Sequence, residues 1–100
     1  VFATPVYWYS MSAQLKTFFD RFTDLLTVNK ELGRKLRGMP ISVIATGTDA
    51  ELPSSFTGQF ELISNYLGLV YHDPLYCCCP DEFNPQQHQQ AIQDFLGKIA

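Results

Sequence analysis

Two segments of the chain hold residue types that suit the binding of a flat ligand with polar edges. Residues 4–10 place three consecutive aromatic side chains between a rigid proline and a serine hydroxyl. Residues 46–49 include Gly47, which lets backbone N–H groups approach a ligand closely because glycine has no side chain. Each segment follows a short apolar run, so we interpret both as loops at the carboxyl ends of parallel strands. Ligands bind beyond such ends in an open parallel sheet, and the pair therefore predicts a site for a heteroaromatic ring.

A run of three cysteines, Cys77 to Cys79, is the other concentration of reactive groups. Neighbouring strand residues point to opposite faces, so the run cannot easily supply several ligands to one metal ion, and no C-x-x-C spacing occurs. We expect these cysteines to pack at a strand end, with an exposed reactive thiol as the alternative. His72 and His88 fall on different elements with no cysteine pattern beside them, and we interpret both as structural or exposed.

Three strands must position these loops. The apolar run at residues 1–3 predicts the last residues of a buried strand, and the β-branched run at residues 41–45 predicts a strand buried on both faces. Residues 69–78 are strand-like in composition, and Pro74 predicts a sheet edge because proline cannot donate to a β-ladder. Strands that alternate with helices imply right-handed crossovers and a parallel sheet, so the fold class is α/β.

The first predicted helix joins the first two strands. Apolar residues recur at helical spacing over residues 15–26, with polar residues on the other face. Ser10 or Ser12 can cap its start by accepting a hydrogen bond from the first turn. Residues 29–38 are polar and carry two glycines, which predicts a connecting segment with one helical turn.

Two further helices follow the later strands. Residues 54–67 place apolar side chains along one stripe, and Gly68 directly afterwards is the residue type that best ends a helix in the left-handed conformation. Asn84 and Pro85 predict the start of the last helix, because asparagine caps well and proline fits the first turn.

Composition limits the partners and the location of the protein. The 100 residues are 46% apolar and 17% charged, as in one globular domain, and the formal net charge is −3 without a basic cluster. This balance argues against nucleic acid or an anionic membrane as a partner. Crossing a bilayer takes about 20 apolar residues, and each apolar stretch is far shorter than that. The odd cysteine number and the lack of a signal sequence lead us to expect a soluble, cytoplasmic protein.

Residues 4–21 closely resemble the flavin loop and following helix of flavodoxin-like NAD(P)H-dependent FMN reductases and quinone reductases. The matched residues are TPVYWYSMSAQLK from Thr4 to Lys16, followed by Phe18, Phe19, Asp20 and Arg21. The similarity extends more loosely through residues 46–48 and 66–68. It implies a flavodoxin-like three-layer α/β/α fold with a parallel sheet. Residues 1–100 would form the C-terminal part of one flavin-binding domain and hold its last three strand–helix units.

The resemblance implies an FMN-dependent oxidoreductase. Hydride would pass from NADH or NADPH through FMN to a flavin, a quinone or a similar small-molecule acceptor, without an acid or base side chain. The family's phosphate-binding loop follows the first strand of the domain, so we expect that part of the fold before Val1. A homo-oligomer is also implied, and Tyr9 departs from a family pattern that favours a small residue there. The residues implied to contact the flavin ring are Pro5, Val6, Tyr7, Trp8, Ser10, Thr46, Gly47 and Thr48.

Two alternative hypotheses remain open from the sequence. One is a flavin-free module that associates with itself through an exposed strand edge. The other is a one-electron carrier of the flavodoxin type, which would bind FMN but oxidise neither nicotinamide cofactor.

Overall fold

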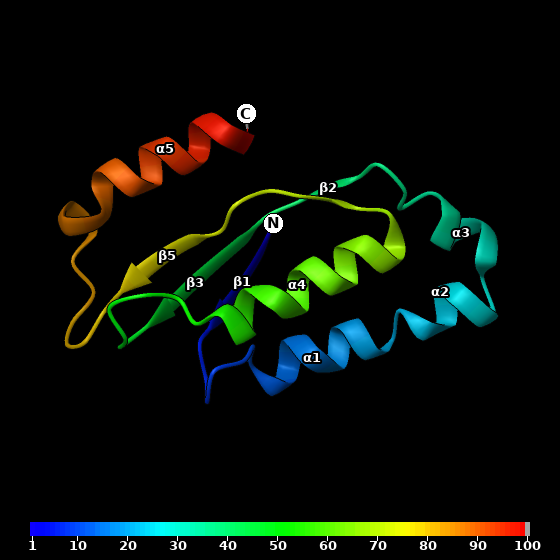
Figure 1. Ribbon diagram of the computed structural model, residues 1–100, viewed down its shortest axis with the longest axis horizontal. Coiled ribbons are helices and arrows are strands. Elements are labelled where there is room, and N and C mark those ends of the chain that lie inside the picture. Colours follow the sequence, from blue (N-terminus) through cyan, green and yellow to red (C-terminus); the bar gives the residue numbers. More distant parts are fainter. Residues whose placement is uncertain (100) are drawn as a thin grey trace.

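Three parallel strands form the central sheet of the protein. The computed structural model describes residues 1–99. Strand β1 (Phe2–Pro5), strand β3 (Val43–Gly47) and strand β5 (Leu75–Cys78) lie in the order β1-β3-β5. Helices cover both faces, with α1 (Ala13–Asp20) and α4 (Ser54–Leu67) side by side on one face and α5 (Gln89–Ile99) on the other (Figure 1). The predicted α/β class, the parallel sheet and the edge position of the third strand are confirmed.

The second and third predicted strands are each divided in two, which corrects the sequence prediction. Short strands β2 (Pro40–Ile41) and β4 (Val70–Tyr71) pair with each other in a separate two-stranded parallel sheet. The partner changes at Ser42, whose carbonyl oxygen accepts from the N–H of Phe2 at 2.9 Å. Pro74 separates β4 from β5, because proline has no N–H with which to continue a ladder.

The first strand is longer and less buried than the sequence predicts. Strand β1 continues through Pro5, which pairs with Thr46. Thr4 is buried, whereas Ala3 is exposed, so one face of β1 is open within the described residues. The cause is the position of α5, which packs on Leu75 and Cys77 of β5.

The larger core lies between the sheet and helices α1 and α4. Its fully covered side chains include Val43, Ala45, Phe56 and Phe60, each with 0% of its surface exposed. Phe19 of α1 meets Phe60 edge to face at a ring-centroid distance of 5.9 Å. Burial of these large apolar groups is the main force that fixes both helices against the sheet. The smaller core on the other face consists of Leu75, Cys77 and Phe95.

The first predicted helix is also interrupted. Helix α1 ends at Asp20, and helix α2 (Thr23–Thr27) follows after a break at residues 21–22. The break consists of i→i−3 bonds, such as Phe22 N–H to the Phe19 oxygen at 2.9 Å, which replace the i→i−4 ladder. Ser12 caps α1 as predicted by accepting from the Leu15 N–H at 3.3 Å.

The remaining helices agree with the sequence. Helix α3 (Lys30–Arg34) is the single turn expected in the connecting segment, and α4 ends at Gly68, whose φ of 74° is left-handed. The last helix begins with a 3₁₀ turn, η1 (Pro85–His88), and the Asn84 side chain accepts from the Gln86 N–H at 3.0 Å. Among residues 1–99, no helix combines the length and apolar character that a membrane crossing needs.

Candidate functional site

The sheet register brings the two predicted loops to one edge. Pro5 lies opposite Thr46, and the next N–H, that of Val6, donates to the Thr46 oxygen at 2.7 Å. Beyond this point the chain encloses a cavity of about 210 Å³ at the carboxyl ends of β1, β3 and β5. We call it the strand-end hollow, and it is lined by Val6, Trp8, Tyr9, Gly47, Thr48, Asp49 and Tyr76. The expectation that both loops share one edge of the sheet is confirmed.

A strained two-residue turn forms one wall of the hollow. Trp8 and Tyr9 have φ angles of 48° and 68°, the left-handed region in which non-glycine residues are uncommon. Tyr7 and Ser10 close the turn by exchanging backbone hydrogen bonds of 2.9 and 3.1 Å. Positive φ at both central residues defines a type I′ turn, which normally contains Asn-Gly. Each left-handed residue costs about 1–2 kcal/mol, and such strain is concentrated at ligand clamps and other functional sites.

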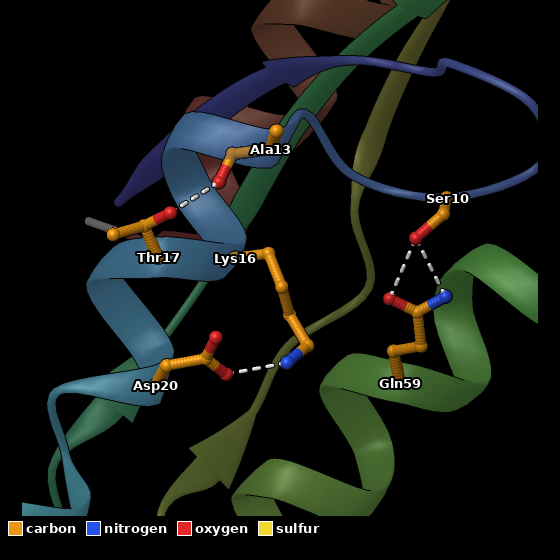
Figure 2. A network of polar contacts seen from close by, with 6 residues as sticks. All are labelled: Ser10, Ala13, Lys16, Thr17, Asp20 and Gln59. Carbon is orange, nitrogen blue, oxygen red and sulfur yellow. Dashed lines mark hydrogen bonds and ion pairs between the residues drawn. The ribbon is translucent and has the colours of Figure 1, made fainter.

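Side chains of helix α4 hold this turn in place. The Ser55 hydroxyl donates to the Tyr9 carbonyl oxygen at 3.0 Å. The Ser10 hydroxyl points at the Gln59 amide group and bonds to both of its polar atoms, at 3.0 and 2.9 Å (Figure 2). These contacts join residues 46 and 49 positions apart in the sequence, so the turn is fixed by tertiary structure.

Helix α1 begins directly behind the turn. The Ser12 N–H donates to the Thr4 hydroxyl at 2.9 Å, which ties the helix start to β1. Figure 2 also shows the i,i+4 ion pair between Lys16 and Asp20 on the exposed surface of this helix. That pair lies along the helix and does not line the hollow, so it contributes to the helix surface.

The turn presents aromatic surface and free hydrogen-bond donors to solvent. Trp8 is 91% exposed, although a tryptophan side chain is usually among the most covered in a protein. Within residues 1–99, the backbone N–H groups of Trp8, Tyr9 and Thr48 make no hydrogen bond to the protein. Flat apolar surface beside unpaired donors fits a planar ring that has carbonyl oxygens and nitrogens along its edge.

Gly47 and Tyr76 form the floor of the hollow. A Cβ atom at Gly47 would lie 2.8 Å from the Tyr76 hydroxyl oxygen, so only glycine fits without a shift. That hydroxyl donates to the Asp49 carbonyl oxygen at 2.6 Å and thereby fixes the loop after β3. Burial, together with the nearby Cys78 and Asp49, raises the pKa of Tyr76, which keeps the phenol protonated as a donor.

The structure divides the eight predicted site residues into two groups of four. Val6, Trp8, Gly47 and Thr48 line the hollow. The other four do not line it: Pro5 ends β1 and pairs with Thr46 of β3, Tyr7 closes the turn, and the Ser10 hydroxyl is engaged with Gln59.

Three lining residues were missed by sequence reasoning about the ring contacts. These are Tyr9, Asp49 and Tyr76. Tyr76 lies close to the carboxyl end of the third predicted strand. The expected parallel sheet could therefore have indicated that Tyr76 lies at the same edge as the two loops. Its role depends on the register Ala45↔Tyr76, which the sequence does not specify.

The cysteine run and one histidine lie beside this edge. Cys77 is buried, so the predicted strand-end packing is confirmed for it, and all three cysteines are free thiols. His88 contacts Cys79, which corrects the expectation that no cysteine lies beside it. Among residues 1–99, no group of three or more potential ligands is arranged for a metal ion.

Comparisons with known proteins agree with this architecture. A family model described as flavodoxin-like fold matches residues 1–99. The chain is 34% identical over 77 residues to a Bacillus subtilis protein named "Putative NAD(P)H-dependent FMN-containing oxidoreductase YwqN". That match covers 71% of this chain and 41% of the relative, so the chain spans less than half of the relative's length.

A solved structure shares the fold at similar coverage. It is that of the Trp repressor binding protein from Bacillus subtilis, with a TM-score of 0.77 and 26% sequence identity. The similarity covers 90% of this chain and 57% of the solved chain. In that comparison, too, this chain corresponds to a little over half of its neighbour.

Proposed function

This chain belongs to the flavodoxin-like fold family, and from that premise we propose that it binds the ring of FMN at the strand-end hollow for NAD(P)H-dependent oxidoreduction. The name of the relative, an NAD(P)H-dependent FMN-containing oxidoreductase, supports this chemistry. The observation that carries the proposal is the Trp8–Tyr9 turn, which is strained, anchored from α4 and exposed. The side chains of Trp8 and Tyr9 stay outside the core, at 91% and 60% exposed, and are therefore accessible to a flat ligand.

The residues present fit the flavin ring. Val6, Trp8, Gly47 and Thr48 line the hollow together and would contact the edge of the ring that enters it. The free N–H groups of the two loops would meet its polar edge. At about 210 Å³ the hollow is smaller than the roughly 300–1,000 Å³ of sites that enclose a whole ligand, so it suits one edge of the ring.

FMN, when bound, would supply the redox chemistry between a nicotinamide and an acceptor. The chain's own residues bind and orient. Trp8 offers an aromatic face, and Tyr76 keeps the loop of Gly47 in place through its bond to Asp49. The lining contains one carboxylate, that of the exposed Asp49, so we assign no side chain as a proton donor or acceptor.

A binding titration tests the proposal. FMN is added to the purified chain, or to a longer form of the protein that contains it, and bound flavin is measured by absorbance after removal of the excess. Stacking contacts contribute about 0.5–1.5 kcal/mol, so Trp8→Ala should weaken FMN binding several-fold. Tyr66→Ala is the matched control, because Tyr66 is an exposed aromatic residue on α4 outside the hollow. Equal affinities of both variants and the parent would contradict the site.

The flavin-loaded protein then distinguishes an enzyme from an electron carrier. NADH or NADPH is added with a quinone or free flavin as the acceptor, and the loss of nicotinamide absorbance is followed. The proposal predicts oxidation of at least one nicotinamide cofactor. A protein that holds FMN and oxidises neither would instead behave as a flavodoxin-type carrier.

A further inference from the structure

Cys79 and His88 form a thiol–imidazole pair next to the strand-end hollow. The Cys79 sulfur lies 4.0 Å from Nε2 of His88. The Cys79 N–H donates to the Gly47 carbonyl oxygen at 2.7 Å, which fixes the cysteine at the carboxyl end of β5. Both side chains are half-buried, so small reagents can reach the pair from solvent.

The imidazole is held in a defined orientation. His88 ends the 3₁₀ turn η1, whose start is capped by Asn84. Its ring stacks on that of Phe83, with centroids 5.4 Å apart and planes inclined by 6°. A nucleophile beside a base that a third group orients is the arrangement that activates cysteine side chains in proteins.

The three neighbouring cysteines lie in three different environments. Cys77 is buried, and this burial, together with the nearby Cys79, raises the pKa of its thiol. Cys78 lies 3.7 Å from the Thr48 carbonyl oxygen, a contact in which its sulfur can only donate. The Cys79 sulfur lies 3.3 Å from the Cys77 carbonyl oxygen, to which it can donate, and of the three thiols it alone also contacts a nitrogen base. The chain thus contains two internal controls for the reactivity of one thiol.

We propose that Cys79, with His88 as its base, is a site of reversible thiol modification by low-molecular-weight disulfides. Nε2 of His88 takes the thiol proton, and the Cys79 sulfur attacks one sulfur of the disulfide. The disulfide bond breaks, a bond forms between Cys79 and the attacked sulfur, and the other sulfur leaves as a thiolate that is then protonated. Cys79 is oxidised to a mixed disulfide while the leaving sulfur is reduced, so no further oxidant is needed.

The test is the rate of reaction of the folded chain with dithiobis(nitrobenzoate), an aromatic disulfide that releases a coloured thiolate. At neutral pH we expect one fast thiol, which Cys79→Ser removes and Cys78→Ser retains. His88→Gln should slow it on the order of tenfold, below the usual contribution of a positioned base. Tandem mass spectrometry of the briefly treated parent protein locates the label without any substitution, and we expect it on Cys79. A label on Cys78, or an unchanged rate in His88→Gln, would overturn the proposal.

A pH series separates proton transfer from a merely structural role of His88. At about pH 9.5 hydroxide in solution can take a thiol proton directly, so the parent and His88→Gln should react at similar rates there if His88 acts as a base. The other titratable groups near Cys79 are Tyr76, Cys77 and Cys78, and the raised pKa values of Tyr76 and Cys77 keep both neutral at physiological pH. If the parent still reacted about tenfold faster than His88→Gln at pH 9.5, His88 would affect only the access of the reagent to Cys79, which would contradict the proposal.

Discussion

The protein uses aromatic residues in two opposite ways. Phe56 and Phe60 are fully buried between α4 and the sheet, whereas Trp8 is 91% exposed at the end of β1. The buried rings have relaxed helical backbone and pack at ordinary aromatic distances, such as 5.2 Å between Phe56 and Phe60. The exposed ring sits on backbone with a φ of 48°. One region is organised for stability, and the other retains strain and exposure that stability does not require.

The difference shows that residue type alone does not identify a binding site. Both regions are rich in aromatic residues, and composition cannot tell them apart. Burial and backbone conformation can, because a core aromatic residue gains from being covered while a binding residue must remain accessible. Substitutions should therefore change unfolding in one region and ligand affinity in the other.

The largest effect is expected in the core. Phe60→Ala removes a fully buried ring and should lower the free energy of unfolding by about 3–5 kcal/mol, measured by urea denaturation. Phe18→Ala is the matched control. Because Phe18 is 48% exposed, this substitution should lower the free energy of unfolding much less. A loss below about 1 kcal/mol in Phe60→Ala would contradict the claim that the buried aromatic residues are the ones that stabilise the fold.

A smaller loss is expected at the floor of the hollow. Gly47→Ala places a methyl group 2.8 Å from the Tyr76 hydroxyl oxygen, and such overpacking costs about 1–3 kcal/mol. Tyr76→Phe removes that oxygen, so the double variant should recover part of the loss. Urea denaturation of both single variants and the double variant measures the coupling. Additive effects would show that the two residues do not meet.

A gain in stability is expected at the turn. The double substitution Trp8→Asn and Tyr9→Gly installs the residues that a type I′ turn prefers. Each left-handed residue costs about 1–2 kcal/mol, so relief at these two positions should raise the free energy of unfolding by at least about 1 kcal/mol. The same variant should bind FMN more weakly than the parent. Unchanged FMN affinity would show that the strain serves no ligand.

The smallest effect concerns Tyr71, whose buried hydroxyl has no hydrogen-bond partner in the structure of residues 1–99. Its burial, with Glu61 and Asp73 nearby, raises its pKa to about 12. The folded protein then keeps a proton that an unfolded tyrosine releases near pH 10, so stability should fall as the pH rises from about 10 to about 12. Tyr71→Phe should change stability by less than about 0.5 kcal/mol at neutral pH and reduce this fall. If the stability of Tyr71→Phe fell equally steeply over this pH range, groups other than Tyr71 would be responsible for the fall.

The sequence was sufficient for the order of elements and for the edge that holds the site. Local backbone chemistry was enough to predict three features: the sheet-edge position of the strand that contains Pro74, the end of α4 at Gly68, and the start of the last helix at Asn84. The split at Ser42 could not be predicted, because it depends on the bond between the Ser42 carbonyl oxygen and the distant Phe2 N–H. The break at residues 21–22 uses local i→i−3 bonds, and no glycine or proline in the segment signals it. The type I′ turn was equally hidden, since Trp-Tyr is not a sequence that favours it and α4 holds it from 46 residues away. A contact between distant segments also explains why Tyr76 was missed. The Cys79–His88 pair was missed because it depends on the path of the chain between β5 and η1.

The emission of Trp8 tests the central claim most directly, because Trp8 is the single tryptophan of the chain and stands in the proposed site. FMN is titrated into the protein while tryptophan fluorescence is recorded, with free tryptophan as the control for absorption of light by the flavin. We expect saturable quenching of Trp8 that parallels FMN binding and exceeds the control. Binding of FMN with no quenching beyond the control would place the ring elsewhere and contradict the account.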